Sequence, residues 1–142
     1  GMAAHLSAGH LYVILEVADI LAVESYSQID PFPPPVLVSS GNCYPDLTAI
    51  DPTGQRLLIE VERGTYKNGN EREAKWLQAA EAGGGVIHLV TPNNEVMMAV
   101  LDEVKQILAR RDRRAAIRAC NIREYRKGAR GVNGEIWTFE TD

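Results

Sequence analysis

Residues 44–62 read YPDLTAIDPTGQRLLIEVE, and this stretch decides the fold. Its two halves, residues 44–50 and 56–61, are rich in residues that favour strands. The tetrapeptide between them, residues 51–54, reads DPTG and carries the side chains that β-turns prefer. The stretch therefore predicts a β-hairpin at the centre of the chain.

Three carboxylates belong to this predicted hairpin. The turn places Asp46 opposite Ile59 or Glu60, and the two-residue spacing of Glu60 and Glu62 puts both glutamates on one face of their strand. Like charges so close repel one another, and a divalent cation removes that repulsion. Oxygen ligands suit Mg²⁺ or Mn²⁺. The sequence thus predicts a metal site, with the alternative that Asp46 merely begins the first strand while Glu60 and Glu62 face solvent on an edge.

The remaining segments alternate between helical and strand patterns. Helices are expected at residues 10–26, 70–82 and from about residue 92 to 108. Strands are expected near residues 36–38, 86–90, 117–122 and 135–139, with a proline-rich extended connector at residues 29–35. This order predicts a single α/β domain spanning residues 1–142, with a mixed central sheet flanked by helices and a C-terminal α/β extension.

The hairpin also carries a family resemblance. Pro45-Asp46, followed by Ile59-Glu60-Val61-Glu62, resembles the motif of the PD-(D/E)xK nuclease superfamily. Residues 60–65 and Lys75 look like the plasmid replication-relaxation group and related mobile-element proteins. The resemblance covers about residues 11–92 and implies a restriction-endonuclease-like core, which runs helix, three strands, helix, strand.

The resemblance implies a function as well: a magnesium- or manganese-dependent endonuclease that hydrolyses phosphodiester bonds of DNA in plasmid or mobile-element biology. Asp46 and Glu60 would bind the metal, and Glu62 would be a ligand or a water-orienting base. Because Glu62 stands at the usual lysine position, the catalytic cation would come from Lys75, or from Lys67 before the helix. The missing lysine equally favours an inactive nuclease-fold module for DNA binding or protein assembly.

Secondary candidates have plain structural alternatives. Glu16 and Glu24 lie on the first predicted helix, and each is either a further acidic metal ligand or a solvated helix residue. His88 is expected to be a packed, hydrogen-bonded core residue, and Trp76 and Trp137 are expected to pack in the core or at its edge. Gln78 shares the helical face of Lys75.

Charge is distributed unevenly along the chain. Residues 110–130 hold nine basic and two acidic side chains, whereas residues 1–109 hold six basic and fourteen acidic ones. Such a basic block is either a footprint for the phosphate backbone or a solvated face that balances the acidic body. The candidate DNA contacts are Arg110, Arg111, Arg113, Arg114 and Arg118.

Composition restricts the class of protein. No apolar run approaches the roughly 20 residues that cross a bilayer. Cys43 and Cys120 form neither a disulfide framework nor a metal-ligand pattern, so a reducing cytoplasm is expected. The sequence has no phosphate-binding glycine loop, and its histidines lack zinc spacing. The expected partners are DNA and either a second copy or other mobile-element proteins, with no membrane.

Overall fold

The structure, a computed structural model, describes residues 7–64 and 69–141. Its helices are α1 (Ala8–Val23), α2 (Gly69–Ala82), α3 (Asn94–Arg110), α4 (Ile122–Arg126) and the short 3₁₀ helix η2 (Val132–Gly134). Its strands are β1 (Ser27–Pro31), β2 (Val36–Val38), β3 (Gly41–Cys43), β4 (Leu47–Ile50), β5 (Arg56–Val61), β6 (Val86–Thr91), β7 (Ala116–Asn121) and β8 (Phe139–Glu140). The predicted α/β class is confirmed.

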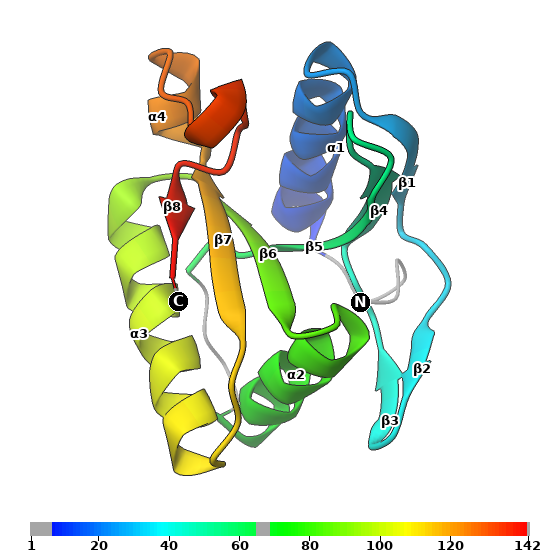
Figure 1. Cartoon of the computed structure of the whole chain (residues 1–142), viewed down its shortest axis with the longest axis vertical. Coiled ribbons are helices and arrows are strands. Elements are labelled where there is room, and N and C mark those ends of the chain that lie inside the picture. Colours follow the sequence, from blue (N-terminus) through cyan, green and yellow to red (C-terminus); the bar gives the residue numbers. More distant parts are fainter. Residues whose placement is uncertain (1–6, 65–68, 142) are drawn as a thin grey trace.

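Six strands form a mixed sheet in the order β1-β4-β5-β6-β7-β8, and β2 and β3 form a separate hairpin (Figure 1). The strands β1, β4 and β5 are antiparallel neighbours, whereas β5, β6 and β7 are parallel. Parallel neighbours need crossover connections, and α2 and α3 provide them. The first half of the sheet is therefore a meander, and the second half is built from strand-helix-strand units.

The predicted central hairpin is present as β4 and β5, where Leu47 pairs with Ile59. In its turn, the carboxylate of Asp51 accepts backbone N–H bonds from Thr53 and Gln55, each at 2.9 Å. Such local hydrogen bonds are why aspartate favours turns. The turn sets the register, and the register brings Asp46 next to the end of β5.

Helices cover both faces of the sheet. The helix α1 packs on one face through residues such as Ile14 and Leu21. The helices α2 and α3 pack on the other face through Trp76, Val100 and Leu101. Because side chains alternate along a strand, β6 and β7 supply apolar residues to both core layers, whereas β4 and β5 supply them to the layer beneath α1.

Several local features differ from the sequence-based expectations. The strand expected at residues 36–38 forms as β2, but it lies outside the main sheet and pairs with β3, which was not predicted. The connector at residues 29–35 begins as part of β1, where Pro31 is tolerated because it ends an edge strand. The strand expected at residues 135–139 is reduced to β8, because Ile136 and Trp137 instead turn into the core beside α1. The short helix α4 was not expected, and the side chain of Asn121 caps it by accepting the N–H of Glu124.

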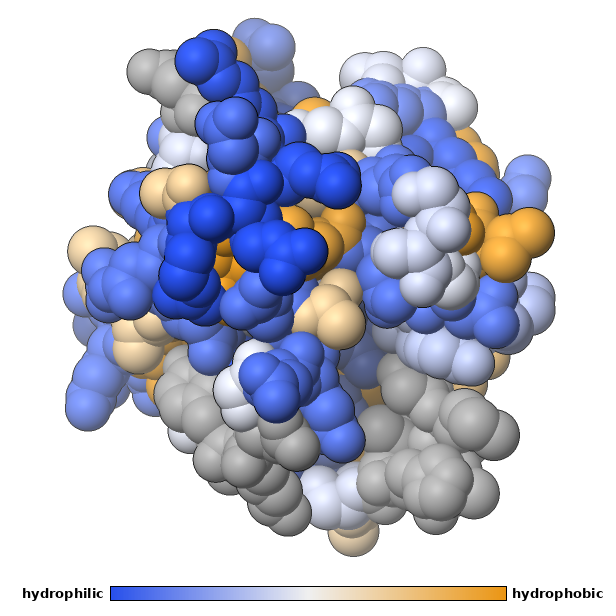
Figure 2. Space-filling model, turned by 90° about the horizontal axis from the view of Figure 1, so that it is seen from below, coloured by the Kyte–Doolittle hydropathy of each residue, from blue (hydrophilic) through white to orange (hydrophobic). Residues whose placement is uncertain are grey.

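The helix α3 ends, and β7 begins, at the lower end of the molecule in Figure 1. Seen from that end, strongly hydrophilic side chains surround a few hydrophobic ones (Figure 2). None of the helices in the described ranges is long and apolar enough to cross a bilayer.

Candidate functional site

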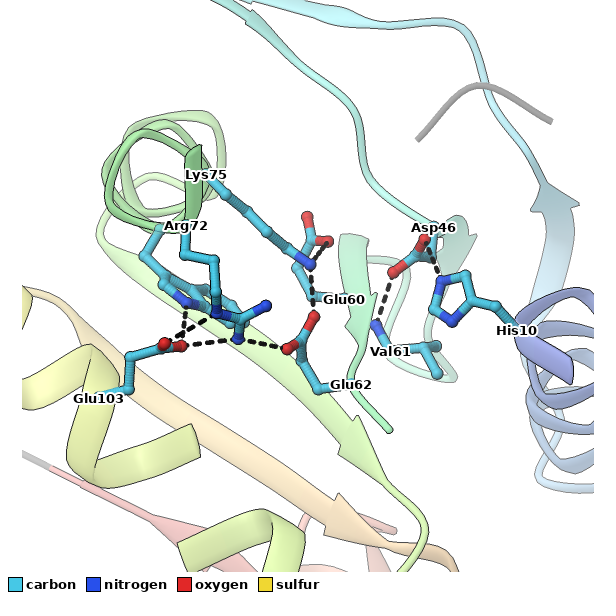
Figure 3. Close-up of polar contacts among 9 residues, drawn as sticks. His10, Asp46, Glu60, Val61, Glu62, Arg72, Lys75 and Glu103 are labelled. Carbon is cyan, nitrogen blue, oxygen red and sulfur yellow. Dashed lines mark hydrogen bonds and ion pairs between the residues drawn. The ribbon is translucent and has the colours of Figure 1, made fainter. Parts of the chain in front are cut away.

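Strand alternation directs the two glutamates of β5 toward α2. Ile59 and Val61 enter the core layer beneath α1, so Glu60 and Glu62 point to the opposite face. Both glutamates are buried. Lys75 on α2 reaches down to them: its Nζ lies 2.5 Å from Oε2 of Glu62 and 3.8 Å from Oε2 of Glu60 (Figure 3). The predicted approach of Lys75 to the carboxylates is observed.

A second cation reaches Glu62 from the same helix. Arg72 donates to Oε1 of Glu62 at 2.5 Å and to both oxygens of Glu103 on α3, at 2.7 and 2.8 Å. The indole N–H of Trp76 also donates to Glu103, at 2.8 Å. Since Arg72 and Lys75 lie three residues apart, they share one helical face. Glu62 is therefore clamped between two cations, one on each oxygen.

Asp46 lies just before β4, beside the end of β5 that carries Glu60. Its N–H donates to the carbonyl of Ile59 at 3.1 Å, which fixes it against the end of β5. Its Oδ2 accepts the N–H of Val61 at 2.8 Å, and its Oδ1 lies 3.2 Å from Nε2 of His10 on α1. Asp46 is thus buried and held from both sides, by a strand and by a helix (Figure 3).

Burial and neighbouring charges shift the pKa values of these groups. Burial raises the pKa of Glu60 to about 8; Lys75 opposes this rise, and Asp46 and Glu62 add to it. Burial alone would lower the pKa of Lys75, but Glu60, Glu62 and Asp46 raise it above its ordinary value. Burial likewise opposes ionisation of Asp46, but its hydrogen bonds and Lys75 lower its pKa. The site thus joins a charged aspartate, a charged lysine and a glutamate that resists ionisation.

The surface opens into a cleft above these residues. The cleft has a volume of about 450 Å³ and is lined by His10, Tyr44, Asp46, Glu71, Ala74, Lys75 and Gln78. The presence of Gln78 agrees with the prediction that it shares a face with Lys75. Behind Lys75, Oε2 of Glu60 is buried and accepts no hydrogen bond from the residues the structure describes. An unsatisfied buried acceptor is costly, and a cation entering the cleft would satisfy it.

The three predicted carboxylates differ in what they can bind. Asp46 and Glu60 sit on neighbouring strands, whereas Glu62 is turned toward Arg72 and Lys75. Within residues 7–64 and 69–141, no three His, Cys, Asp or Glu side chains are grouped in a way that could hold a metal ion. Two carboxylates still match what Mg²⁺ commonly takes from a protein, because it keeps several waters.

The predicted DNA-contacting arginines separate into two sets. Arg110 and Arg111 pair with Glu73 on α2, at 3.0 and 2.9 Å. Arg118 on β7 pairs with Glu135, and with Glu140 at 3.0 Å.

The other set, Arg113 and Arg114, is exposed and makes no ion pair within the described part of the chain. Of the five predicted DNA contacts, only these two have no acidic partner among the described residues, so contact with DNA stays a prediction.

Glu16 and Glu24 pair with residues of α4 rather than with the metal-site candidates. Glu16 pairs with Arg126 at 2.6 Å, and Glu24 accepts a hydrogen bond from Tyr125 at 2.7 Å, so both join α1 to α4. Lys67 lies outside the described residues. The packing predictions for Trp76, Trp137 and His88 are confirmed; these residues are buried, and the rings of His88 and Trp137 meet edge-on with centroids 4.9 Å apart. The hydrogen bond expected of His88 is not found at Nε2, which is buried without a partner among the described residues.

Sequence reasoning missed two residues of the site. His10 was set aside because no zinc spacing relates the histidines, and contact with Asp46 depends on a helix 36 residues earlier. Arg72 could have been identified from the sequence, because it precedes Lys75 by three residues on a helix that follows the two glutamates. The helical spacing that selected Lys75 therefore also selects Arg72.

Comparison of the chain with models of known protein families, with curated proteins and with solved structures finds no match.

Proposed function

We propose that this protein is a metal-dependent endonuclease that hydrolyses phosphodiester bonds of DNA. One observation carries the proposal: Oε2 of the buried Glu60 has no hydrogen-bond partner among the described residues and lies 3.8 Å from Nζ of Lys75, which lines a cleft together with Asp46. This combination supplies hard anionic ligands and a cation within one pocket. Phosphoryl transfer needs both, because charge develops on the phosphoryl oxygens.

The order of elements supports the same proposal. Along the main sheet the chain runs helix α1, three antiparallel strands β1, β4 and β5, helix α2 and the parallel strand β6. This is the order of a restriction-endonuclease-like core, with the β2-β3 hairpin inserted. Together with the Pro45-Asp46 and Glu60-Val61-Glu62 motifs, it supports placement among PD-(D/E)xK nucleases, and through them a role in plasmid or mobile-element biology.

Magnesium or manganese would be held by the carboxylates of Asp46 and Glu60. The donors fit a hard cation: both are oxygen ligands, and Oε2 of Glu60 lacks a hydrogen-bond partner within the described ranges. A divalent cation bound there would supply Lewis acidity and an activated water.

The chain's own residues have separate roles in this proposal. The ammonium of Lys75 would stabilise charge on the phosphoryl oxygens. Val61 and His10 hold the carboxylate of Asp46 in place. Both oxygens of Glu62 are already occupied by cations, so we assign to it the positioning of Lys75 rather than metal ligation.

A second candidate function is a nuclease-fold module without catalysis, for DNA binding or protein assembly. The observation that favours it is the same pair of cations. Arg72 and Lys75 neutralise Glu62 without any metal, so the carboxylate cluster is stable as a purely structural element.

A plasmid-nicking assay tests the proposal. Supercoiled DNA should be nicked in Mg²⁺ or Mn²⁺ and left intact in EDTA. The Lys75→Ala variant should lose nicking but keep the metal-induced rise in melting temperature, because lysine is not a metal ligand. Lys75→Arg should recover little, since a guanidinium does not replace a compact ammonium.

The matched control is Lys127→Ala, directly after α4, which removes one positive charge far from the cleft and should nick like the parent. Nicking by Lys75→Ala at the parent rate would contradict the assigned role of Lys75. A parent protein that binds DNA but never nicks it with either metal would favour the non-catalytic module.

A further inference from the structure

The cleft above Asp46 and Lys75 continues across α2. It shares Ala74 and Gln78 with a second cleft of about 380 Å³, whose other lining residues are Ser40, Asn70, Glu73, Leu77 and Arg111. Ala74 is exposed and contributes only a methyl group between the two. The ridge of α2 is therefore low at this point, and the two clefts meet over it.

The second cleft leads to the cationic end of α3. Arg111 lines it, and the next residues, Arg113 and Arg114, line a third cleft of about 640 Å³. Lys105 lies on the same wall as these arginines, and Leu108 and Ile117 supply apolar lining. The first two clefts share lining residues, and the third begins two residues along the chain from Arg111, at Arg113.

The charges at the α3 end of this path are suited to an anion, whereas the first cleft is lined by Asp46 and Glu71 as well as by Lys75. Residues 105–114 contain five basic side chains and one acidic side chain, Asp112. Glu73, which also lies on the path, is already paired with Arg110 and Arg111. At the opposite end of the molecule, by contrast, the basic side chains Arg126 and Arg130 are tied to acidic residues of or beside α1. The end of α3 lies at the opposite end of the molecule from α4 (Figure 1), and the surface seen from that side is strongly hydrophilic (Figure 2).

We infer that a DNA strand runs from the Asp46–Lys75 cleft, over Ala74, to a phosphate-binding end formed by Lys105, Arg113 and Arg114. A nucleic-acid strand fits because it carries a charge at every nucleotide and so meets cations along a line of clefts. Arginine side chains also suit the geometry of phosphate. The inference rests on the proposed function and names the path of its substrate.

Binding measurements in EDTA test the path without cleavage. Fluorescence anisotropy of a labelled single strand and of a labelled duplex would be recorded at several salt concentrations. Arg113→Glu/Arg114→Glu should weaken binding about tenfold or more at low salt. It should also reduce the slope of log affinity against log salt by about 1.4 for a single strand or 1.8 for a duplex, since each phosphate contributes about 0.7 or 0.9. The two labelled DNAs distinguish which form the path accepts.

The matched control is Arg123→Glu/Lys127→Glu, on α4 and directly after it, which changes the net charge equally at the other end of the molecule. It should change binding by less than about threefold. Equal weakening by both double variants would mean a general charge effect and would overturn the inference. Absence of binding to either DNA at low salt would overturn it too, as would binding of an acidic peptide in preference to DNA.

A second variant tests the junction of the clefts. Ala74→Glu would place a carboxylate between the carboxylate site and the arginines, whereas Ala74→Gln adds the same bulk without charge. Both substitutions suit an exposed helix position, so the fold should survive, as thermal melting would verify. Ala74→Glu should weaken both DNA binding and nicking, and Ala74→Gln should affect them much less. Equal effects would remove Ala74 from the path.

The two proposals fail separately. If the parent binds DNA through Arg113 and Arg114 but does not nick it with metal, the endonuclease proposal fails and the path stands. If the parent nicks DNA and Arg113→Glu/Arg114→Glu binds and nicks equally well, the path fails and the endonuclease proposal stands.

Discussion

Two groups of ion pairs tie helices to the rest of this molecule, and they differ in burial. At the carboxylate site, the side chains of Arg72 and Glu62 are 12% and 8% exposed. Between α4 and α1, the side chains of Arg126 and Glu16 are 55% and 30% exposed. The residue types are the same, but only the first pair has lost most of its hydration. A buried charge depends on its partner, whereas an exposed charge still has water.

The largest expected effect comes from breaking the buried group. Arg72→Ala leaves Glu103 without its guanidinium and leaves one oxygen of Glu62 buried without a donor. Removing one partner of a buried pair typically lowers the free energy of unfolding by about 3–5 kcal/mol. Lys75 remains on the other oxygen of Glu62, so the lower end of that range is expected. Urea unfolding followed by circular dichroism would measure the loss.

The companion variant Arg72→Met separates packing from charge, because it keeps the aliphatic stem of the side chain. It should be nearly as destabilised as Arg72→Ala. A loss below about 1 kcal/mol in both variants would mean that this pair behaves like a surface pair, and the contrast between the two regions would disappear.

The buried site was largely readable from the sequence, for physical reasons. Strand alternation alone puts Glu60 and Glu62 on one face, and the DPTG turn fixes the register that brings Asp46 beside them. Helical periodicity then selects Lys75. All of these are short-range rules, and short-range rules also identified the central hairpin and the three long helices.

What the sequence did not disclose depends on long-range packing. His10 meets Asp46 only because α1 packs on the sheet with its first turn beside the start of β4. Arg110 and Arg111 read as part of one basic block, but α2 brings Glu73 to them from 37 and 38 residues away. No local pattern tells a paired arginine from an uncommitted one, so Arg113 and Arg114 could not be separated from Arg118.

The second largest effect concerns metal binding at the buried site. Mg²⁺ or Mn²⁺ should raise the melting temperature of the parent, since a ligand at a hundredfold excess over its Kd stabilises the native state by about 2.7 kcal/mol. Asp46→Asn removes the charge but keeps an oxygen that can accept the N–H of Val61, and it should abolish most of that rise. Differential scanning fluorimetry with a metal titration would measure it. Equal shifts in the parent and the variant would remove Asp46 from the metal site.

A smaller effect is expected in the pH dependence of stability. The pKa of Glu60 is about 8 in the folded protein, because burial disfavours the carboxylate, against an ordinary value of 4.5. Between these two values the folded state keeps a proton that the unfolded state has lost. The stabilisation that protonated Glu60 gives the folded state is therefore complete below pH 4.5 and is lost as pH rises to about 8. Over this range the free energy of unfolding falls by no more than about 1.4 kcal/mol per pH unit.

Glu60→Gln keeps the shape of the side chain but cannot ionise. Its free energy of unfolding should depend less on pH than that of the parent, with the difference growing from pH 5 to pH 8. Urea unfolding at unit pH intervals in EDTA would measure it. Parallel pH profiles for the two proteins would show that Glu60 does not titrate in this window.

The smallest effect should come from the exposed pair. Arg126→Ala removes the 2.6 Å contact between α4 and Glu16, but both groups are hydrated, and such pairs typically contribute about 0.2–1 kcal/mol. The loss should shrink further in 0.5 M salt, because added ions screen charges that water reaches. The loss from Arg72→Ala should change little with salt, because its partners are largely out of the solvent. Measuring both variants at low and high salt therefore compares the two regions directly. A large, salt-insensitive loss from Arg126→Ala would mean that α4 is held to α1 by a desolvated contact, and that exposure does not distinguish the two groups of ion pairs.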